Sequence, residues 1–299
     1  FKNLGSNYSR KIVLYGLIDS VTIDSSKFLG QETPNYSDNH SSIYGTSNAS
    51  ATGLKIQNST FTGGGGYAIY LYNDNENPVT TGLEIINNTF TDTYNGIYAR
   101  YYDALTIRGN TIKGSYMYDR GIYIKYCDYA NVIEDNIINA PDLSYGIWIE
   151  LSGGSIAVNR PAIVNNLINA EDYGIYFNTN NYYWDIYYNT VHVRDNIAFH
   201  TYYSNNYHNV KNNIFLTEST GDPAVKYYYT NTVSSSDYND FYSNYTYPIY
   251  ASGNKTLAQW QAYGQDSNSV NIDPIFNSDS TLVPQVLSLD NLGAPISGI

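Results

Sequence analysis

The sequence predicts an all-β protein, a single-stranded parallel β-helix of about nine to ten stacked coils with a short capping helix near the C-terminus. Three observations predict this fold. An asparagine returns after a short apolar run at intervals of 22 to 33 residues, a glycine-led segment recurs between the asparagines, and helical spacing of apolar residues is nearly absent. A repeat of roughly 20 to 50 residues that cannot bury its own apolar side chains must stack on its neighbours.

The recurring asparagine holds one place in successive coils. It stands at Asn88, Asn110, Asn136, Asn166, Asn189 and Asn213, and serines hold the same place earlier, at Ser26 and Ser59. Asparagine tolerates a left-handed backbone and can bond both its own backbone and the next coil, so it suits a turn. Strands stacked about 4.8 Å apart would align these side chains into a ladder. We therefore interpret the asparagines as structural.

The glycine-led segments predict the longer strand of each coil. They are Gly96–Ala99, Gly121–Ile124, Gly146–Ile149 and Gly174–Phe177. Successive side chains of a strand point to opposite faces, so Ile97 and Ala99 are expected in the core while Tyr98 and Arg100 point outward. The same parity places His200 in the inward column with Phe177, and Phe199 in the outward one.

The C-terminal region predicts the one real helix. Thr256 is a suitable N-cap, a short amphipathic stretch follows, and Gly264 ends it, so this helix should cover the open end of the core. We divide the chain into a parallel β-helix over residues 1–250 and a cap with a closing segment over 251–299, both in one elongated domain. No Ser/Gly-rich linker interrupts the repeats.

These repeats resemble the right-handed parallel β-helix repeat family, which includes pectate-lyase-like proteins. The closing segments Asp266–Ser269 and Asp273–Phe276 are similar to those of many bacterial surface β-helix proteins. The resemblance implies right-handed winding and a bacterial extracellular or cell-surface location. Phe1–Asn3 reads like the end of an earlier coil and 291–296 like the start of a further segment, so we expect a fragment of a larger protein with flanking domains.

Composition excludes several classes of partner. The net charge is −12, the isoelectric point is about 4.5, and Lys plus Arg number only 15, which argues against nucleic acid. No apolar stretch reaches the roughly 20 residues that a membrane-spanning helix needs. Cys127 is the single cysteine, so there is no internal disulfide, and we interpret it as packing filler.

The first candidate site is an outward column of aromatic side chains. It contains Tyr44, Tyr70, Tyr98, Tyr123, Trp148, Tyr176 and Phe199. Such a row could lie against a polysaccharide or cell-surface glycan, each ring packing on the apolar face of a sugar. Rings one coil apart are also within stacking distance of each other, and we prefer stacking for stability over glycan contact.

The second candidate is the next outward column, Arg100, Lys125 and Glu150. A lyase or epimerase acting on acidic polysaccharide must neutralise a carboxylate, remove the adjacent proton and donate another. Arg100 could bind the carboxylate, Lys125 could act as base, and Tyr98, Tyr123 or Tyr126 could donate the proton. Glu150 would keep Lys125 charged, so we prefer a salt ladder across the coils. A register shift at Asn131 would turn Lys125 inward.

The sequence indicates no cofactor. The four histidines form no HExxH pair, so zinc is not indicated. Residues 74–77 offer oxygen ligands for calcium but lack the twelve-residue calcium-loop pattern, and we prefer a solvated acidic loop. Loops at about 29–42, 73–81 and 151–160, with the adjacent tyrosines of 101–102, 182–184 and 202–203, could rim a shallow groove.

We therefore expect an extracellular or cell-surface β-helix module that recognises carbohydrate or a surface, or that serves structural display. The alternatives are a polysaccharide lyase or epimerase and a purely structural stalk or surface-array unit.

Overall fold

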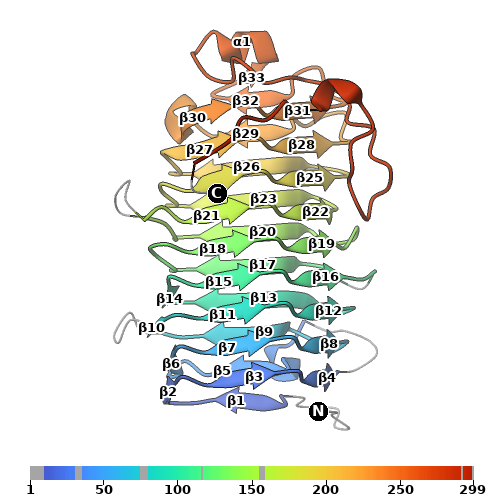
Figure 1. Cartoon of the computed structure of the whole chain (residues 1–299). Helices are drawn as coiled ribbons and strands as arrows, with labels where there is room; N and C mark the ends of the chain where they lie inside the picture. Colours follow the sequence, from blue (N-terminus) through green and yellow to red (C-terminus); the bar gives the residue numbers. More distant parts are fainter. Residues whose placement is uncertain are drawn as a thin grey trace.

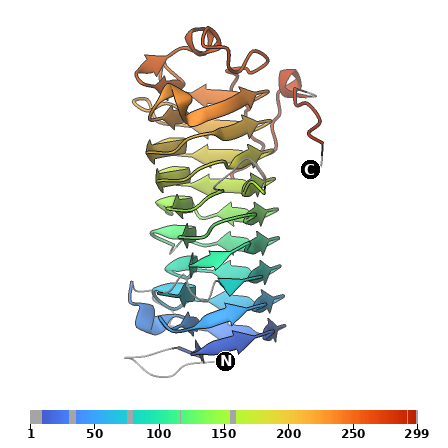
Figure 2. The ribbon, with the colours of Figure 1, turned by 90° about the vertical axis from the view of Figure 1, so that its left-hand side faces the viewer.

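The computed structural model describes residues 10–30, 36–74, 80–115, 117–154, 159–290 and 292–297. Within them the chain winds as a parallel β-solenoid with three long sheets (Figure 1). The sheets run the length of the solenoid, and the C-terminal segment runs outside them (Figure 2). In sheets 2 and 3, defined below, nine strands are separated by eight turns, so the predicted nine to ten coils are slightly too many.

Sheet 1 contains the longest strands. Its members are β1 (Ile12–Leu14), β5 (Ile43–Gly45), β9 (Tyr67–Tyr72), β13 (Asn95–Arg100), β17 (Arg120–Lys125), β20 (Tyr145–Glu150), β23 (Tyr173–Thr179), β26 (Ile197–Tyr203), β29 (Val225–Tyr227), β32 (Ile249–Ala251) and the antiparallel β33 (Asn254–Lys255). The glycine-led segments lie in these strands, as predicted.

Sheets 2 and 3 complete each coil. Sheet 2 contains β3 (Thr22–Asp24), β7 (Lys55–Gln57), β11 (Glu84–Ile86), β15 (Thr106–Arg108), β18 (Val132–Glu134), β21 (Ala162–Val164), β24 (Asp185–Tyr187), β27 (His208–Lys211) and β30 (Val233–Asp237). Sheet 3 contains β4 (Lys27–Leu29), β8 (Thr60–Thr62), β12 (Thr89–Thr91), β16 (Thr111–Lys113), β19 (Ile137–Asn139), β22 (Leu167–Ala170), β25 (Thr190–Val193), β28 (Ile214–Thr217) and β31 (Asp240–Ser243).

The remaining elements are short. Two-stranded sheets pair β2 (Leu17–Asp19) with β6 (Ser50–Thr52), and β10 (Thr80–Thr81) with β14 (Tyr102–Asp103). Three-residue 3-10 helices are η1 (Asp38–His40), η2 (Thr230–Thr232) and η3 (Leu287–Leu289), and the single α-helix of the described residues is α1 (Leu257–Gln261).

The core forms from the inward side chains of all three sheets. Ile97, Ala99 and Ile122 are fully buried, as the alternation predicted. In sheet 3, Phe28, Phe61 and Phe90 stack with ring centroids 4.7 and 4.9 Å apart. Identical residues therefore pack on one another from coil to coil, which is the packing that a repeat sequence specifies.

The asparagine ladder lies between sheets 2 and 3 and is buried. At Asn136 the side-chain Oδ1 accepts from the backbone and side-chain nitrogens of Asn110, both at 3.0 Å, and Nδ2 donates to Ile107 O at 2.9 Å. The left-handed backbone falls on the preceding residue, for example Asp135 with φ 56°. The asparagines are structural because they satisfy backbone groups of neighbouring coils, and the turn geometry belongs to the residue before them.

The glycine of sheet 1 is required by close approach between coils. A Cβ on Gly146 would lie 2.6 Å from Gly174 O and 2.5 Å from Ile168 Cγ2. In the coil after Gly174, Ala198 stands where the earlier coils have glycine. There Ile175 pairs with Phe199, and Tyr176 pairs with His200. The prediction for this coil was therefore wrong by one residue, because its glycine marker is replaced by alanine.

Helix α1 forms where it was predicted and covers the last coil (Figure 1). Thr256 Oγ1 accepts from Gln259 N at 3.2 Å, and Gln259 Oε1 accepts from Thr256 N at 2.9 Å, which is a capping box. Trp260 is fully buried, contacts Tyr227 and donates to Asp266 Oδ2 at 2.7 Å. The helix thus closes the end of the core with one large aromatic side chain.

Candidate functional site

The predicted aromatic column forms on the outer face of sheet 1. Tyr44, Tyr70, Tyr98, Tyr123, Trp148 and Tyr176 occupy paired positions, and His200 continues the column where Phe199 was predicted. Successive ring centroids lie 4.8 to 5.5 Å apart. Tyr44 and Tyr70 are stacked, and the following pairs are tilted or edge-on, so the rings contact one another, as preferred from the sequence.

Neighbouring side chains cover most of this column. Tyr98 is only 6% exposed, since Tyr67 and Tyr72 pack against it at 5.3 and 6.4 Å. The Arg120 guanidinium lies 4.1 Å from the Trp148 ring centroid. The column therefore offers ring edges, while its faces are used within the protein.

His200 is buried in this column and has no hydrogen bond among the described residues. Tyr173 and Tyr176 pack against its ring at 5.5 and 5.2 Å. Burial, and secondarily the charge of Lys226, lower the pKa of His200 to about 3. The prediction that His200 points into the core was wrong, because the coil is shifted by one residue.

The charged column lies at the carboxyl ends of the sheet 1 strands. Arg100 pairs with Lys125, and Lys125 pairs with Glu150, on consecutive coils. The strand after Asn131 begins at Val132, so Lys125 keeps its outward orientation. The structure thus brings all three predicted residues together.

Each charge in this column already has an opposite charge. Lys125 Nζ lies 2.7 Å from Glu150 Oε1, and Arg100 Nη1 lies 2.8 Å from Asp74 Oδ1. Tyr123 donates its hydroxyl to Glu150 Oε2 at 2.6 Å. The arrangement is a network of ion pairs, and it leaves neither cation free to neutralise a substrate carboxylate.

The titration of this network opposes acid–base catalysis. Burial alone would raise the pKa of Glu150, but hydrogen bonds from Lys125 and Tyr123 outweigh it and lower that pKa. Burial and the hydrogen bond to Glu150 raise the pKa of Tyr123 far above its ordinary value. Glu150 stays ionised and Tyr123 stays protonated near neutral pH, so neither group is suited to exchange a proton with a substrate.

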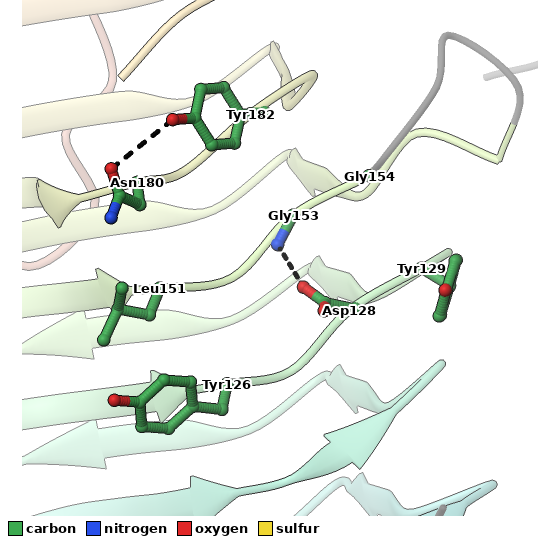
Figure 3. Close-up of a pocket in the computed structure, with 8 residues that line it drawn as sticks. All are labelled: Tyr126, Asp128, Tyr129, Leu151, Gly153, Gly154, Asn180 and Tyr182. Carbon is green, nitrogen blue, oxygen red and sulfur yellow. Dashed lines mark hydrogen bonds between the residues drawn. The ribbon is translucent and has the colours of Figure 1, made fainter. Parts of the chain in front are cut away.

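A pocket with a volume of about 270 Å³ opens beside the charged column (Figure 3). Its lining residues follow strands β17, β20 and β23 on three consecutive coils: Tyr126, Asp128, Tyr129, Leu151, Gly153, Gly154, Asn180 and Tyr182. Figure 3 shows Tyr126, Tyr129 and Tyr182 around a backbone floor at Gly153.

Turn geometry positions these side chains. Tyr126, Leu151 and Asn180 each follow a strand with left-handed backbone, at φ 52°, 50° and 51°. The next residue of each coil turns inward into a second polar ladder, in which Ser152 Oγ accepts from Cys127 N at 3.0 Å. The residue just before this ladder, which is Tyr126, Leu151 or Asn180, therefore points outward at the end of its strand.

Glycine forms the floor because the coils approach closely there. A Cβ on Gly153 would lie 2.5 Å from Tyr182 O. Gly153 N donates to Asp128 Oδ1 at 3.0 Å, and Tyr182 donates its hydroxyl to Asn180 Oδ1 at 3.4 Å. The pocket therefore combines one exposed and two half-buried tyrosine rings with a carboxylate and an amide, and none of its eight lining residues is cationic.

The sequence indicated this region only in outline. The tyrosines of 182–184 and the loop at 151–160 were expected to rim a groove, and Tyr182, Gly153 and Gly154 do line the pocket. Residues 155–158 of that loop lie outside the described residues. Tyr129 was missed, because a single tyrosine between Asp128 and Ala130 carries no repeat signal.

No metal site is found in the described part of the chain. It contains no group of three or more His, Cys, Asp or Glu side chains that could hold an ion. Of the proposed calcium loop, Asp74 pairs with Arg100, and 75–77 lie outside the described residues.

Cys127 is buried, and burial raises the pKa of its thiol to about 12. None of the described helices is long and apolar enough to span a membrane.

Comparisons with known proteins give one family. The family model described as "Right handed beta helix region" matches residues 41–220. No curated protein matches the chain. Among solved structures, the crystal structure of DFA-IIIase from Arthrobacter chlorophenolicus A6 in complex with GF2 is similar, with 14% identity and a TM-score of 0.35. The alignment covers 78% of this chain and 65% of that chain.

Proposed function

We propose that this chain, which belongs to the right-handed beta helix family, is a module for carbohydrate recognition. Its binding site is the pocket of Tyr126, Tyr129 and Tyr182. We place this recognition outside the cell or at its surface. The partner is a glycan chain, and the parent protein would supply flanking domains.

The exposed ring of Tyr129, beside the half-buried Tyr126 and Tyr182, carries the proposal. Tyr129 is 51% exposed, whereas Tyr98 in the aromatic column is 6% exposed. A sugar presents an apolar C–H face and a rim of hydroxyl groups, so it matches a tyrosine ring beside Asp128 and Asn180. The pocket volume is close to the lower end of ordinary ligand sites, which suits one or two sugar units of a longer chain.

The ligand of this pocket is a neutral glycan. No cation lines the pocket, and the nearby Lys125 is paired with Glu150 at 2.7 Å. The net charge of −12 opposes the approach of an acidic polysaccharide. The same pairing removes the support for a lyase or epimerase centred on Arg100 and Lys125.

We expect replacement of Tyr129 by asparagine to weaken glycan binding about tenfold, which corresponds to about 1.4 kcal/mol. Tyr129 has φ 57°, and asparagine accepts this backbone, so the variant removes the ring without straining the turn. Binding is measured on a glycan array and then by calorimetry with the best neutral ligand.

Tyr207→Asn is the matched control. Tyr207 has φ 67° and is 45% exposed, and it follows Asn206, which lies on the same row of parallel bridges as Asp128 and Tyr182. It does not line the pocket. Equal losses in both variants, or no glycan bound by the wild type, would contradict the proposal.

The stacked aromatic column supports a second candidate, a structural stalk. Rings that contact each other along sheet 1 stiffen the rod, whether or not the pocket is used. If the array gives no ligand, the stalk is the remaining function.

A further inference from the structure

A second group of exposed tyrosines lies further along the solenoid than the pocket described above, here called the tyrosine pocket. Tyr202 and Tyr203 end strand β26, and Tyr228 and Tyr229 follow strand β29. These four residues form the tyrosine patch. Tyr202, Tyr203 and Tyr229 are 48%, 51% and 43% exposed, and Tyr228 is half-buried. Exposed aromatic side chains gathered at one place are typical of an interaction site.

Tyr228 is the centre of the patch. The ring centroids of Tyr202 and Tyr203 lie 6.0 and 5.5 Å from that of Tyr228, and the Tyr229 centroid lies 4.7 Å from it, all three in edge-on contact. An edge-on contact covers at most one face of a ring. Tyr203 and Tyr229 make no other ring contact within the described residues, so each keeps a ring face accessible to a ligand. In the aromatic column of sheet 1, by contrast, the ring faces are used within the protein.

The patch begins on the coil next to the tyrosine pocket. Thr179, which precedes Asn180 of the pocket, pairs with Tyr203, so β26 directly follows the last coil that lines the pocket. Strands β17, β20, β23, β26 and β29 are stacked in this order in sheet 1 (Figure 1). Tyr129 follows β17 and Tyr229 follows β29, so four coil spacings separate them. At the usual spacing of strands in a sheet, this is roughly 19 Å along the solenoid axis.

In the opposite direction the rings beside the pocket are covered. Tyr101, on the coil before Tyr126, stacks face to face on it, with the centroids 4.7 Å and the planes 7° apart. The Arg100 guanidinium lies 4.9 Å from the Tyr101 ring centroid and 5.5 Å from that of Tyr126. These contacts use the ring faces on that side. A chain that leaves the pocket therefore finds accessible rings toward the tyrosine patch.

We infer that the ligand is a linear neutral glycan that lies parallel to the solenoid axis, with one part in the tyrosine pocket and the next part on the tyrosine patch. This inference rests on the proposed function. The glycan is longer than the one or two sugar units that suit the pocket, and the rings of Tyr203 and Tyr229 pack against the apolar faces of its further units. The patch residues are uncharged near neutral pH, which suits a neutral chain.

The test is calorimetry with a length series. The probe is the linear neutral glycan that gives the strongest signal on the glycan array, prepared at lengths of two, four and six sugar units. We expect the affinity of the wild type to rise about tenfold from two to six units, because the longer chain adds contacts with the patch. Equal affinity at all three lengths overturns the inference.

Two variants remove the rings of the patch. Tyr203 lies in strand β26 and Tyr229 has extended backbone, so Tyr203→Thr and Tyr229→Thr place a residue that prefers this conformation. Each variant should reduce the gain in affinity with length and leave binding of the two-unit probe unchanged, which also shows that the variant is folded. Tyr207→Asn is the matched control on the same coil as Tyr203. Its ring already stacks on Tyr183 at 5.1 Å, so this variant should keep the gain.

The outcomes separate this inference from the proposed function. If both patch variants keep the full gain, the inference is wrong and the patch serves another partner, such as a protein. An equal loss of the gain in Tyr207→Asn would show a general effect of exposed tyrosines and would also overturn it. Failure of the proposed function has a different signature: the array gives no ligand, or Tyr129→Asn binds the two-unit probe as tightly as the wild type does.

Discussion

Replacing Asn136 by alanine is expected to destabilise the solenoid by about 3–5 kcal/mol, a large effect for one polar side chain. The side chain is fully buried, and its Oδ1 accepts from two nitrogens of Asn110 while Nδ2 donates to Ile107 O and Asn166 Oδ1. Alanine would leave Asn110 N buried without its partner and would remove the side-chain donor to Ile107 O. Urea unfolding followed by circular dichroism measures the loss.

Asn136→Ser is the matched variant, because serine holds this ladder position naturally at Ser59. There the serine Oγ accepts from Ser26 N at 3.0 Å, so a serine at 136 can still satisfy Asn110 N. It should lose clearly less stability than alanine. If both variants lost the same amount, the ladder would contribute through packing alone and the hydrogen-bond account would be wrong.

The second large effect is a pH-dependent stability that depends on Asp240. This carboxyl is fully buried on β31, and burial raises its pKa to about 7, although the hydrogen bond from Ile272 N at 3.0 Å opposes the rise. The nearby Asp273 raises it further. The folded protein therefore keeps the proton up to about pH 7, whereas the unfolded chain loses it near pH 4.

The sign follows from this difference in bound protons. The contribution of Asp240 is fully present below about pH 4, declines as the pH rises to about 7, and is constant above that value. The decline is about 4 kcal/mol, from a pKa difference of about three units. The side chain of Asp240→Asn cannot ionise, so this variant should not show the decline. Its free energy of unfolding should therefore increase relative to that of the wild type as the pH rises.

Urea unfolding of both proteins at pH 4.5, 6 and 8 checks this result. His200 and His208, whose pKa values burial lowers to about 3, act in the opposite direction but are common to both proteins. Asp279→Asn removes an exposed carboxylate and controls for net charge. Parallel stability curves for wild type and Asp240→Asn would refute the assignment.

The fold could be predicted from the sequence because the same spacing of asparagine, glycine and alternating apolar residues recurs in successive coils. The ladder positions and the paired columns of sheet 1 depend on spacing that recurs, and so does the placement of Arg100, Lys125 and Glu150 on consecutive coils. The prediction was wrong where a marker changed, since Ala198 replaces glycine and moves His200 into the aromatic column.

The sites were less predictable because they depend on contacts that do not repeat. The tyrosine pocket is formed by turn residues whose direction follows from left-handed backbone at Tyr126 and Tyr129. The C-terminal segment folds back along the solenoid, where Asn169 Nδ2 donates to Asp279 O across 110 residues. Neither arrangement can be predicted from the repeat pattern of the sequence.

The asparagine ladder also has a direction. Each backbone N–H donates to the side-chain oxygen of the next coil, from Ser26 through Asn213 to Asn239, so the amide dipoles point the same way along the solenoid axis. At the far end Asn239 Nδ2 donates to Asp266 Oδ1 at 2.9 Å, and Asp266 is buried under Trp260. Asn239 N donates to Ser269 Oγ at 2.8 Å, and Ser269 Oγ donates to Asp266 Oδ1 at 2.6 Å, so both routes out of the ladder end on the same carboxyl group under the cap.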